Sequence, residues 1–377
     1  MKELRNDEFK GVKVLAGIDA LYYFLDNNTE LYQKIYEMQK NSDEVICEYF
    51  KQFSNVDISY QGKSGGKNAF IGFWYSVKLN NIPLFRFGIK DPLKQQQVKN
   101  IFVQLDGCGI YAFGIKNQIE KVNSILNLFF DIDITLKDCI LSKVDLNFFV
   151  AGYDKLLDIK DKNSFRSNLL KHEIDRFYGK GDSLKSQTLY LGSRSGSWLF
   201  RIYNKSVEIL EKDTEFQASI KKDWFLKHGI DVEKQTVFNL EWSLKRGYLT
   251  NTSLNSIYDL FYTYAPKTLY GLILNMVVFL GFDIEFYKKQ RKNNHISRLE
   301  AHPLWTYIFE NFICVVDEIN GSAESVEYFK KVSKPSIYCN LSRAIVSLKN
   351  CNEIENAPIF NDLIDSFEEL RKKYISC

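Results

Sequence analysis

The chain has 377 residues, of which 45% are hydrophobic and 26% are charged. This composition excludes an intrinsically disordered protein, and it allows one large or two ordinary domains. The 50 Lys and Arg residues nearly balance the 47 Asp and Glu residues, so a net charge of +3 does not by itself indicate a polyanionic partner. A nucleic-acid-binding surface would have to be local.

Cysteine usage and hydropathy indicate a cytoplasmic protein without membrane contact. The seven cysteines are scattered and show neither a Cys-x-x-Cys pair nor the Cys/His spacing of a zinc site. The longest apolar run, residues 269–282, is too short to cross a bilayer and contains Asn275. The first residues lack the apolar segment of a signal peptide.

The first two thirds of the chain alternate β-rich runs with helical patterns. We predict strands at residues 14–24, 69–79, 82–89, 101–107, 109–115, 141–150 and 236–246, and a hairpin at 187–205. Helical periodicity indicates helices at 29–53, 117–130 and 164–178. After about residue 248 the pattern is helical, with helices at 254–264, 268–280 and 304–319 and two more beyond them. The sequence therefore predicts an α+β class: an antiparallel-sheet nuclease domain at 1–250 and an all-helical domain at 251–377 that contacts DNA or a partner.

The hairpin has an unusual division of its side chains. Its sequence is TLYLGSRSGSWLFRIYNK, residues 188–205, and we centre its turn on Ser195 and Gly196. This register pairs Leu191 with Phe200, Leu189 with Ile202, Tyr190 with Arg201, and Thr188 with Tyr203. The leucines, Phe200 and Ile202 then share a buried face, because side chains alternate along a strand. The opposite face carries Tyr190, Arg201, Tyr203 and Lys205.

Two other predicted strands show the same division. Val144, Leu146 and Phe148 alternate with polar residues in one strand, and Leu240 and Trp242 do so in the other. We therefore predict that three strands contribute to one polar sheet face. Its members are Asp145, Asn147, Tyr190, Arg201, Glu241 and Lys245.

These groups suit phosphodiester transfer. A tyrosine can attack a phosphate and hold the strand end as a phosphotyrosine. A guanidinium and a divalent cation would offset charge on the phosphate. Carboxylate and amide oxygens suit Mg²⁺ or Mn²⁺. A strand tyrosine is more often a packing or surface residue, and a carboxylate is more often solvated or salt-bridged, so chemistry alone leaves this structural interpretation open beside the catalytic one.

The hairpin and the residues after it resemble a family signature. The run TLYLGSRSGSWLFRIYNKSVE is similar to the signature of the replication initiation factors of rolling-circle plasmids and of the related relaxases of integrative conjugative elements. The resemblance covers residues 12–250. The matching positions are Thr188, Tyr190, Gly192, Ser193, Arg194, Arg201, Tyr203, Asn204, Lys205 and Glu208.

The resemblance implies roles for individual residues. It makes Tyr190 the nicking nucleophile, with Arg201 stabilising the transferring phosphate, and it gives Asp145 and Glu241 metal-binding roles. Many members carry a second aspartate where Phe149 stands here. Further metal candidates are Asn147 and Asp19. The expected DNA-binding residues are Arg194, Tyr203, Lys205, Lys245 and Arg246.

The sequence thus predicts a metal-dependent nickase that binds origin DNA and starts rolling-circle replication through a 5′-phosphotyrosine. The alternatives are a conjugative relaxase acting at a transfer origin and a non-catalytic origin-binding protein. Residues 62–68 lack the spacing of a nucleotide-binding loop, so a host helicase is an expected partner, and a homodimer would supply a second nucleophile. The basic run at residues 287–298 is a candidate phosphate contact.

Overall fold

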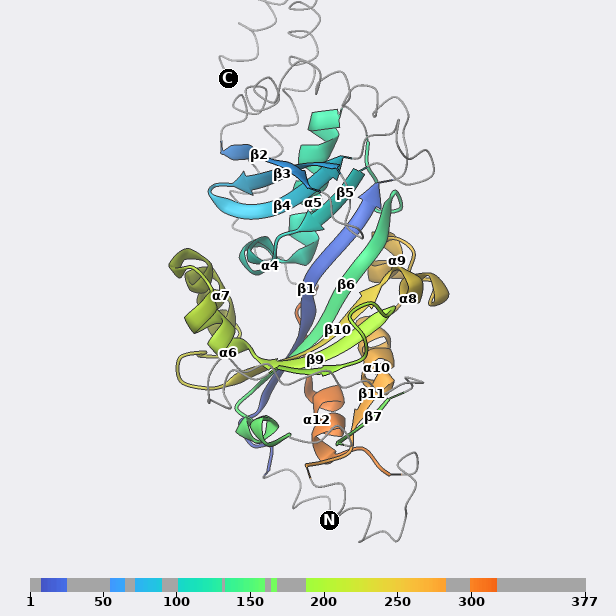
Figure 1. The fold of residues 1–377 in the computed structure, drawn as a ribbon. Coiled ribbons are helices and arrows are strands. Elements are labelled where there is room, and N and C mark those ends of the chain that lie inside the picture. The colour runs from blue at the N-terminus through green and yellow to red at the C-terminus, as the bar shows by residue number, and fades with distance from the viewer. Residues whose placement is uncertain are drawn as a thin grey trace, which may run out of the picture. The chain divides into compact units, whose positions relative to one another are not determined.

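The computed structural model describes residues 8–25, 55–64, 72–89, 101–130, 133–159, 164–167, 188–282 and 299–316. In these residues the main feature is a ten-stranded sheet with the order β2-β3-β4-β5-β1-β6-β10-β9-β8, in which β12 also pairs with β1 (Figure 1). Neighbouring strands are antiparallel except β1 and β12, which are parallel. The strands are β1 (Lys13–Leu25), β2 (Val56–Ser64), β3 (Gly72–Leu79), β4 (Ile82–Ile89), β5 (Ile101–Leu105), β6 (Cys139–Ala151), β8 (Thr188–Leu191), β9 (Trp198–Asn204), β10 (Val237–Lys245) and β12 (Ile313–Cys314).

Helices lie on both sides of the sheet, so the α+β class is confirmed. They are α4 (Gly107–Phe113), α5 (Ile115–Phe130), α6 (Lys205–Val207), α7 (Glu215–Lys227), α8 (Arg246–Asn251), α9 (Ile257–Tyr262), α10 (Pro266–Met276) and α12 (Pro303–Asn311). Short helical turns at Asp154–Asp158 and Glu208–Lys212 complete the described helical segments. A small second sheet pairs β7 (Phe165–Ser167) with β11 (Val277–Phe279).

The chain divides into two compact units, residues 1–320 and 321–377. All described residues belong to the first unit, which contains the sheet together with α8, α9, α10 and α12. The division lies at residue 320 and not at residue 250, where the sequence predicts a boundary.

One face of the strands β6, β10 and β9 forms an aromatic core with α10 and α12. Phe148 of β6 packs edge-on against Tyr270 of α10 with ring centroids 5.2 Å apart, and Phe200 of β9 lies 4.5 Å from Trp242 of β10. Trp305 of α12 lies 6.4 Å from Trp242. Each of these rings is at least nine-tenths buried, which stabilises the sheet by roughly 1.5–3 kcal/mol per side chain. The polar residues of the same strands must therefore point to the opposite face.

The opposite face is partly covered by α7 and α4. Phe149 of β6 packs against Phe225 and Trp224 of α7 at 5.0 and 5.8 Å, and Tyr111 of α4 lies edge-on to Trp224 at 5.0 Å. In Figure 1 these helices lie across the sheet from α10 and α12. They form an apolar wall at one end of the polar face.

Two predicted elements are wrong. Residues 109–115 form α4 and the start of α5 instead of a strand, because Asp106 caps the helix by accepting a 2.9 Å hydrogen bond from Cys108 N. Phe165–Ser167 is strand β7 instead of the start of a helix, and β11 then follows α10 directly. The helix predicted at 29–53 and the basic run at 287–298 lie outside the described residues. Of the glycine-rich stretch at 62–68, residues 62–64 form the end of β2, and residues 65–68 also lie outside the described residues.

The hairpin register is confirmed at all four positions, including Tyr190 opposite Arg201. Its turn differs from the prediction. Gly196 N donates a 2.9 Å hydrogen bond to Ser193 O, so Arg194 and Ser195 are the central residues. The glycine with a positive φ, 98°, is Gly192 at the end of β8, where the chain leaves the strand.

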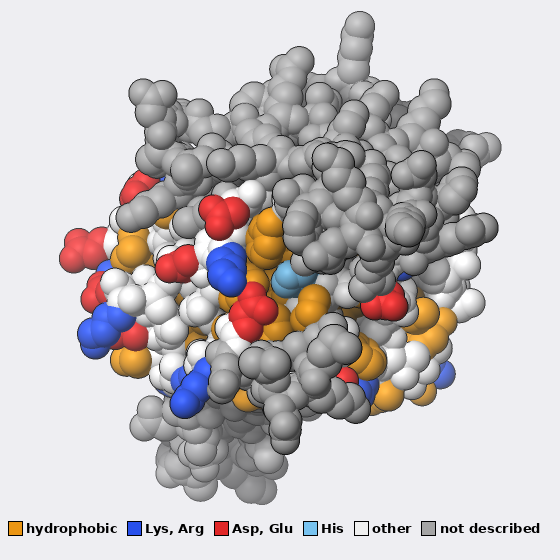
Figure 2. Space-filling model, turned by 90° about the horizontal axis from the view of Figure 1, so that it is seen from below, with side chains coloured by type: hydrophobic (Ala, Val, Ile, Leu, Met, Phe, Trp, Pro, Cys, Tyr) orange, Lys and Arg blue, Asp and Glu red, His pale blue; other side chains and the backbone are white. Residues whose placement is uncertain are grey.

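In the part of the chain that the structure describes, no helix is long and apolar enough to cross a membrane. Figure 2 shows one surface of the molecule, on which described Lys, Arg, Asp and Glu side chains are interspersed with hydrophobic ones. Among the described side chains in that view, no extended region of a single charge sign is visible.

Candidate functional site

A row of directly paired residues crosses five strands and defines the site. Tyr190 of β8 pairs with Arg201 of β9, and Arg201 pairs with Glu241 of β10. Glu241 pairs with Asn147 of β6, which pairs with Gly17 of β1. Paired residues on neighbouring strands have Cβ atoms about 4.5–5.5 Å apart. The sheet therefore brings four of the predicted site residues into one line.

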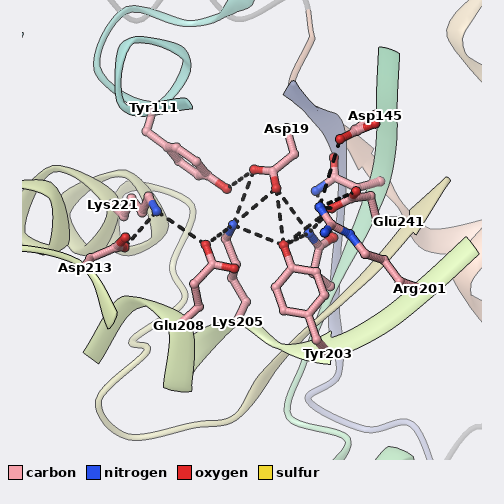
Figure 3. A network of polar contacts seen from close by, with 12 residues as sticks. Asp19, Tyr111, Asp145, Arg201, Tyr203, Lys205, Glu208, Asp213, Lys221 and Glu241 are labelled. Atoms are coloured by element: carbon pink, nitrogen blue, oxygen red, sulfur yellow. Dashed lines mark hydrogen bonds and ion pairs between the residues drawn. The ribbon is translucent and has the colours of Figure 1, made fainter. Parts of the chain in front are cut away.

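A β-bulge adds Asp19 to this face. Ile18 pairs with Leu146 and Ala20 with Asp145, so Asp19 is the extra residue of β1. A bulge turns the strand locally and redirects the side chain of the extra residue. Figure 3 shows Asp19 pointing toward the side chains of β9 and β10.

Arg201 lies between two buried carboxylates. Its Nη2 is 2.5 Å from Glu241 Oε1 and 4.0 Å from Asp145 Oδ2. Lys143 Nζ lies 2.7 Å from the same Asp145 oxygen. The Glu241 and Asp145 side chains are 0% and 2% exposed, whereas Arg201 keeps 33% of its side chain exposed. Arg201 and Lys143, whose side chain is 26% exposed, are thus the members of this ion cluster that reach solvent.

A second group of contacts surrounds Tyr203 and Asp19 (Figure 3). The Tyr203 hydroxyl accepts a 2.7 Å hydrogen bond from Asn239 Nδ2 and lies 3.3 Å from Asp19 Oδ2. Lys205 Nζ is 3.3 Å from the same Asp19 oxygen, and the Tyr111 hydroxyl donates a 2.8 Å bond to Asp19 Oδ1. Both oxygens of Asp19 are therefore engaged by donors of the chain.

The contacts continue into the helical side of the site. Lys205 Nζ also lies 2.7 Å from Glu208 Oε1, which receives Lys221 Nζ at 3.4 Å. Lys221 in turn bonds Asp213 at 2.7 Å. Lys205 is only 1% exposed, so its ammonium group interacts with carboxylates inside the molecule instead of with solvent.

Burial and neighbouring charges change the acidity of these groups in opposite directions. Burial opposes ionisation of Asp19, but Lys205 and the Tyr111 hydroxyl outweigh it and lower the pKa of Asp19 to about 2. Burial and the Asp145 carboxylate raise the pKa of Glu241 to about 8, although Arg201 opposes this rise. Burial disfavours the charge on Lys205, yet Asp19 and Glu208 raise its pKa above the usual value.

The donor atoms fit a hard divalent cation beside Arg201. Asp145 Oδ1 and Asn147 Oδ1 are buried oxygens that accept no hydrogen bond from the part of the chain that the structure describes, and Glu241 lies directly opposite Asn147. Two carboxylates and an amide oxygen are the ligand types that Mg²⁺ and Mn²⁺ prefer. Among the described residues, no three His, Cys, Asp or Glu side chains are arranged to hold a metal, so a cation here would need the amide oxygen as a ligand.

The predicted DNA-binding residues occupy different settings. Arg194 Cζ lies 5.2 Å from the centre of the Tyr190 ring, and Lys245 Nζ donates to the Arg194 carbonyl, so both lie at the hairpin turn. Arg246 donates to the carbonyls of Leu141 and Asn255 at 3.1 and 3.2 Å. Arg246 therefore links α8 to the start of β6, and its guanidinium donates mainly to backbone carbonyls.

Sequence reasoning missed several members of the site, among them Tyr111 and Asn239. Tyr111 was missed because its segment is predicted as a strand. Asn239 stands two residues before Glu241 and so lies on the same strand face. The alternation of side chains along the strand could therefore have identified it. Lys205 and Tyr203 were expected to hold DNA, and the structure instead places their polar atoms within the contacts around Asp19.

Comparison with known proteins gives a distant structural likeness. No protein-family model matches the chain, and no curated protein matches it. Among solved structures, the chain is similar to a rolling circle replication initiator protein from Geobacillus stearothermophilus. That likeness has a TM-score of 0.41 and 13% identity, and it covers 82% of this chain and 98% of the other. It is too distant to assign a function.

Proposed function

We propose that this protein nicks one strand of DNA, with Tyr190 as the nucleophile. The observation that carries the proposal is the paired row Tyr190–Arg201–Glu241–Asn147. It sets a tyrosine beside a partly exposed guanidinium, which in turn borders a cluster of buried oxygen ligands. Phosphodiester transfer needs this combination: a nucleophile, a fixed positive charge and hard oxygen ligands.

The proposed step exchanges one phosphate ester for another. The Tyr190 oxygen forms a bond to phosphorus and loses its proton, while the bond from phosphorus to the 3′ oxygen breaks. The 3′ oxygen takes up a proton and leaves as a hydroxyl, and the 5′ end remains on the tyrosine. The number of phosphate ester bonds is unchanged, so no external energy source is required.

Arg201 is the residue we assign to charge on the phosphate. It pairs directly with Tyr190 and is one-third exposed, so a phosphate approaching the tyrosine meets its guanidinium. A bound Mg²⁺ or Mn²⁺, held by Asp145, Asn147 and Glu241, would supply further positive charge at this place. Asp19 is left out of this ligand set, because donors of the chain occupy both of its oxygens.

Tyr203 is a poor second nucleophile. Its hydroxyl contacts Asn239 at 2.7 Å and Lys205 at 3.4 Å. Burial and the Asp19 carboxylate raise the pKa of Tyr203 well above its usual value. A reaction that ends a round of replication would therefore use the Tyr190 of a second copy, which supports the homodimer as part of the proposal.

A covalent-capture assay tests the proposal. Purified protein is incubated with supercoiled DNA of its own replicon, with and without Mn²⁺, and run on denaturing gels. We expect a metal-dependent protein–DNA adduct that is lost in Tyr190→Phe and kept in Tyr258→Phe, a matched change at a 40% exposed tyrosine of α9. An adduct that survives in Tyr190→Phe would refute the assignment of the nucleophile.

One observation favours a second candidate, an origin-binding protein without catalysis. Glu241 and Asp145 already contact Arg201 and Lys143, so their charges are balanced without a metal. DNA binding with neither nick nor adduct under any metal would support this candidate.

Among nickases, the site of cutting separates a rolling-circle initiator from a conjugative relaxase. An initiator leaves a 3′-hydroxyl at a replication origin for a polymerase and needs a host helicase. A relaxase cuts at a transfer origin. Mapping the nick on DNA that contains both kinds of origin distinguishes them.

A further inference from the structure

The sheet face that carries the site continues into the other half of the sheet. Lys143 stands two residues before Asp145 on β6, so their side chains share a face, and Lys143 pairs with Tyr22 of β1. Tyr22 pairs with Gln104 of β5, and Gln104 pairs with Arg86 of β4. This row therefore runs from the carboxylates to the far strands without leaving the face.

A second row beside it is aromatic. Phe24 of β1 pairs with Phe102 of β5, and their ring centroids are 4.7 Å apart. Trp74 of β3 pairs with Gly88 of β4, which has no side chain, and the Trp74 ring lies edge-on to Phe102 at 5.9 Å. Tyr22 also lies edge-on to Phe102, at 6.1 Å. The four rings form a continuous aromatic group on three strands.

Two cations lie against these rings. Lys143 Nζ is 5.0 Å from the centre of Tyr22, and Arg86 Cζ is 5.9 Å from the centre of Trp74. Arg86 is held in place by a 2.7 Å hydrogen bond from its Nη2 to Gln104 Oε1. None of these five residues is acidic, but Lys143 is also ion-paired with Asp145 at 2.7 Å. Arg86 is therefore the main cation that this part of the face offers to an anion with aromatic bases.

Phe102 is buried, but the other three rings lie outside the core of this half of the sheet. That core is on the other side, where Tyr23 is fully buried and its hydroxyl donates to Asn123 of α5 at 3.3 Å. Tyr22, Phe24 and Trp74 keep part of their surface accessible, and Arg86 is exposed. Large aromatic side chains that keep accessible surface beside cations are typical of a binding surface.

We propose that this surface binds single-stranded DNA, and we call it the aromatic face, defined by Tyr22, Phe24, Trp74, Arg86, Phe102 and Lys143. Bases stack on the accessible rings, and the exposed Arg86 lies near the phosphates, while Lys143 shares its charge with Asp145. A single strand is the fitting ligand because a duplex hides the π faces of its bases. The proposal rests on the proposed function in one respect: the bound strand leads along the shared face to Tyr190.

The test uses a full-length Tyr190→Phe background, so that binding is measured without covalent capture. The probe is fluorescein-labelled oligo(dT) of about 16 nucleotides, the upper site size for one such platform. Fluorescence anisotropy is measured for Tyr22→Leu and Arg86→Gln, with Tyr258→Leu of α9 as a matched loss of an exposed tyrosine elsewhere. Thermal melting checks that each variant folds. Arg86 is exposed, so its variant keeps the test decisive if Tyr22→Leu unfolds.

We expect Tyr22→Leu to weaken binding about fivefold or more, since each stacked base contributes about 1–3 kcal/mol. Arg86→Gln should also weaken binding and lower the log–log salt slope by about 0.7. Tyr258→Leu should bind as the background does, and unlabelled duplex should compete poorly. The proposal is overturned if the two face variants bind oligo(dT) normally, or if duplex competes as well as single strands. In the second case the surface is a duplex or protein contact.

The two proposals fail in distinguishable ways. Loss of oligo(dT) binding in the face variants, together with no adduct in protein that keeps Tyr190, supports the aromatic face and refutes nicking. A normal adduct with unchanged oligo(dT) binding refutes the aromatic face alone.

Discussion

The Tyr111 hydroxyl of α4 donates a 2.8 Å hydrogen bond to Oδ1 of Asp19, the extra residue of the β1 bulge. The other oxygen of Asp19 faces Tyr203 and Lys205. Helix α4 therefore fixes the orientation of a carboxylate that the sheet alone leaves on an irregular stretch of strand.

Replacing Tyr111 by Phe should lower the free energy of unfolding by about 1.5–3 kcal/mol. The change removes a hydrogen bond to a charged group and leaves Asp19 Oδ1 with only the longer, 3.4 Å contact to Lys205. Urea unfolding of wild type and variant measures the difference. Tyr258→Phe on α9, at an exposed position, serves as the control and should change little. Equal decreases in the free energy of unfolding of both variants would show that the Tyr111–Asp19 hydrogen bond makes no specific contribution to stability.

Lys205→Met should be among the most destabilising single changes in the site. It leaves Asp19 and Glu208 without their nearest cation, and breaking a buried ion pair from one side costs about 3–5 kcal/mol. Chemical unfolding of the single variant and of Lys205→Met with Asp19→Asn measures the coupling. We expect the double change to cost less than the sum of the two single changes. Strict additivity would contradict a direct Lys205–Asp19 interaction.

Glu241 should make stability fall as pH rises through the neutral range. Its pKa is raised from 4.5 to about 8, so the folded state holds this proton more tightly than the unfolded state. The resulting stabilisation is complete below pH 4.5 and is lost as the pH approaches 8, with a slope of up to about 1.4 kcal/mol per pH unit.

Urea unfolding of metal-free wild type and Glu241→Gln across this pH range isolates the Glu241 contribution. We expect the stability difference, wild type minus variant, to decrease from pH 4.5 to pH 8. A difference that stays constant or grows would contradict a raised pKa.

Arg201→Met should increase the affinity for Mn²⁺ in the absence of DNA. The guanidinium contacts Glu241 and lies 4.0 Å from Asp145, so it competes electrostatically with a cation at the same carboxylates. Titration of free Mn²⁺ followed by electron paramagnetic resonance should show a dissociation constant lower by about tenfold, which corresponds to about 1.4 kcal/mol. Lys143→Met, beside the same Asp145, provides a comparison. Weaker binding in Arg201→Met would mean that Arg201 helps to organise the cation site.

Local patterns were sufficient to predict the hairpin and the shared face. Alternation along β8, β9 and β10 assigns each side chain to a face, and a turn centred on Ser195 and Gly196 gives the register, so Tyr190 opposite Arg201 could be predicted without knowing the sheet order. The observed turn is centred one residue earlier, on Arg194 and Ser195. The confirmed line from Arg201 to Asn147 then needed only that β6, β10 and β9 be neighbours.

Other parts of the site depend on long-range structure. Residues 109–115 have strand-like composition, but an Asp106 cap and burial of Ile110 and Tyr111 against the sheet select a helix. The bulge at Asp19 follows from pairing with a strand more than a hundred residues away. Lys205 was expected to contact DNA, and its burial depends on Asp19 and Glu208, which are contacts that the sequence pattern does not reveal.

The bulge in β1 also predicts what a single-residue deletion at this point would do in a related sequence. A sequence that lacks one residue between Ile18 and Ala20 would still pair fully with β6 and would keep its hydrophobic alternation. It would, however, lose the Asp19 carboxylate beside Lys205 and keep only that of Glu208. In an alignment, a single-residue gap at this point would therefore mark a protein whose strand is intact but whose buried lysine has lost one of its two carboxylate partners. Such a protein should carry a compensating change at position 205.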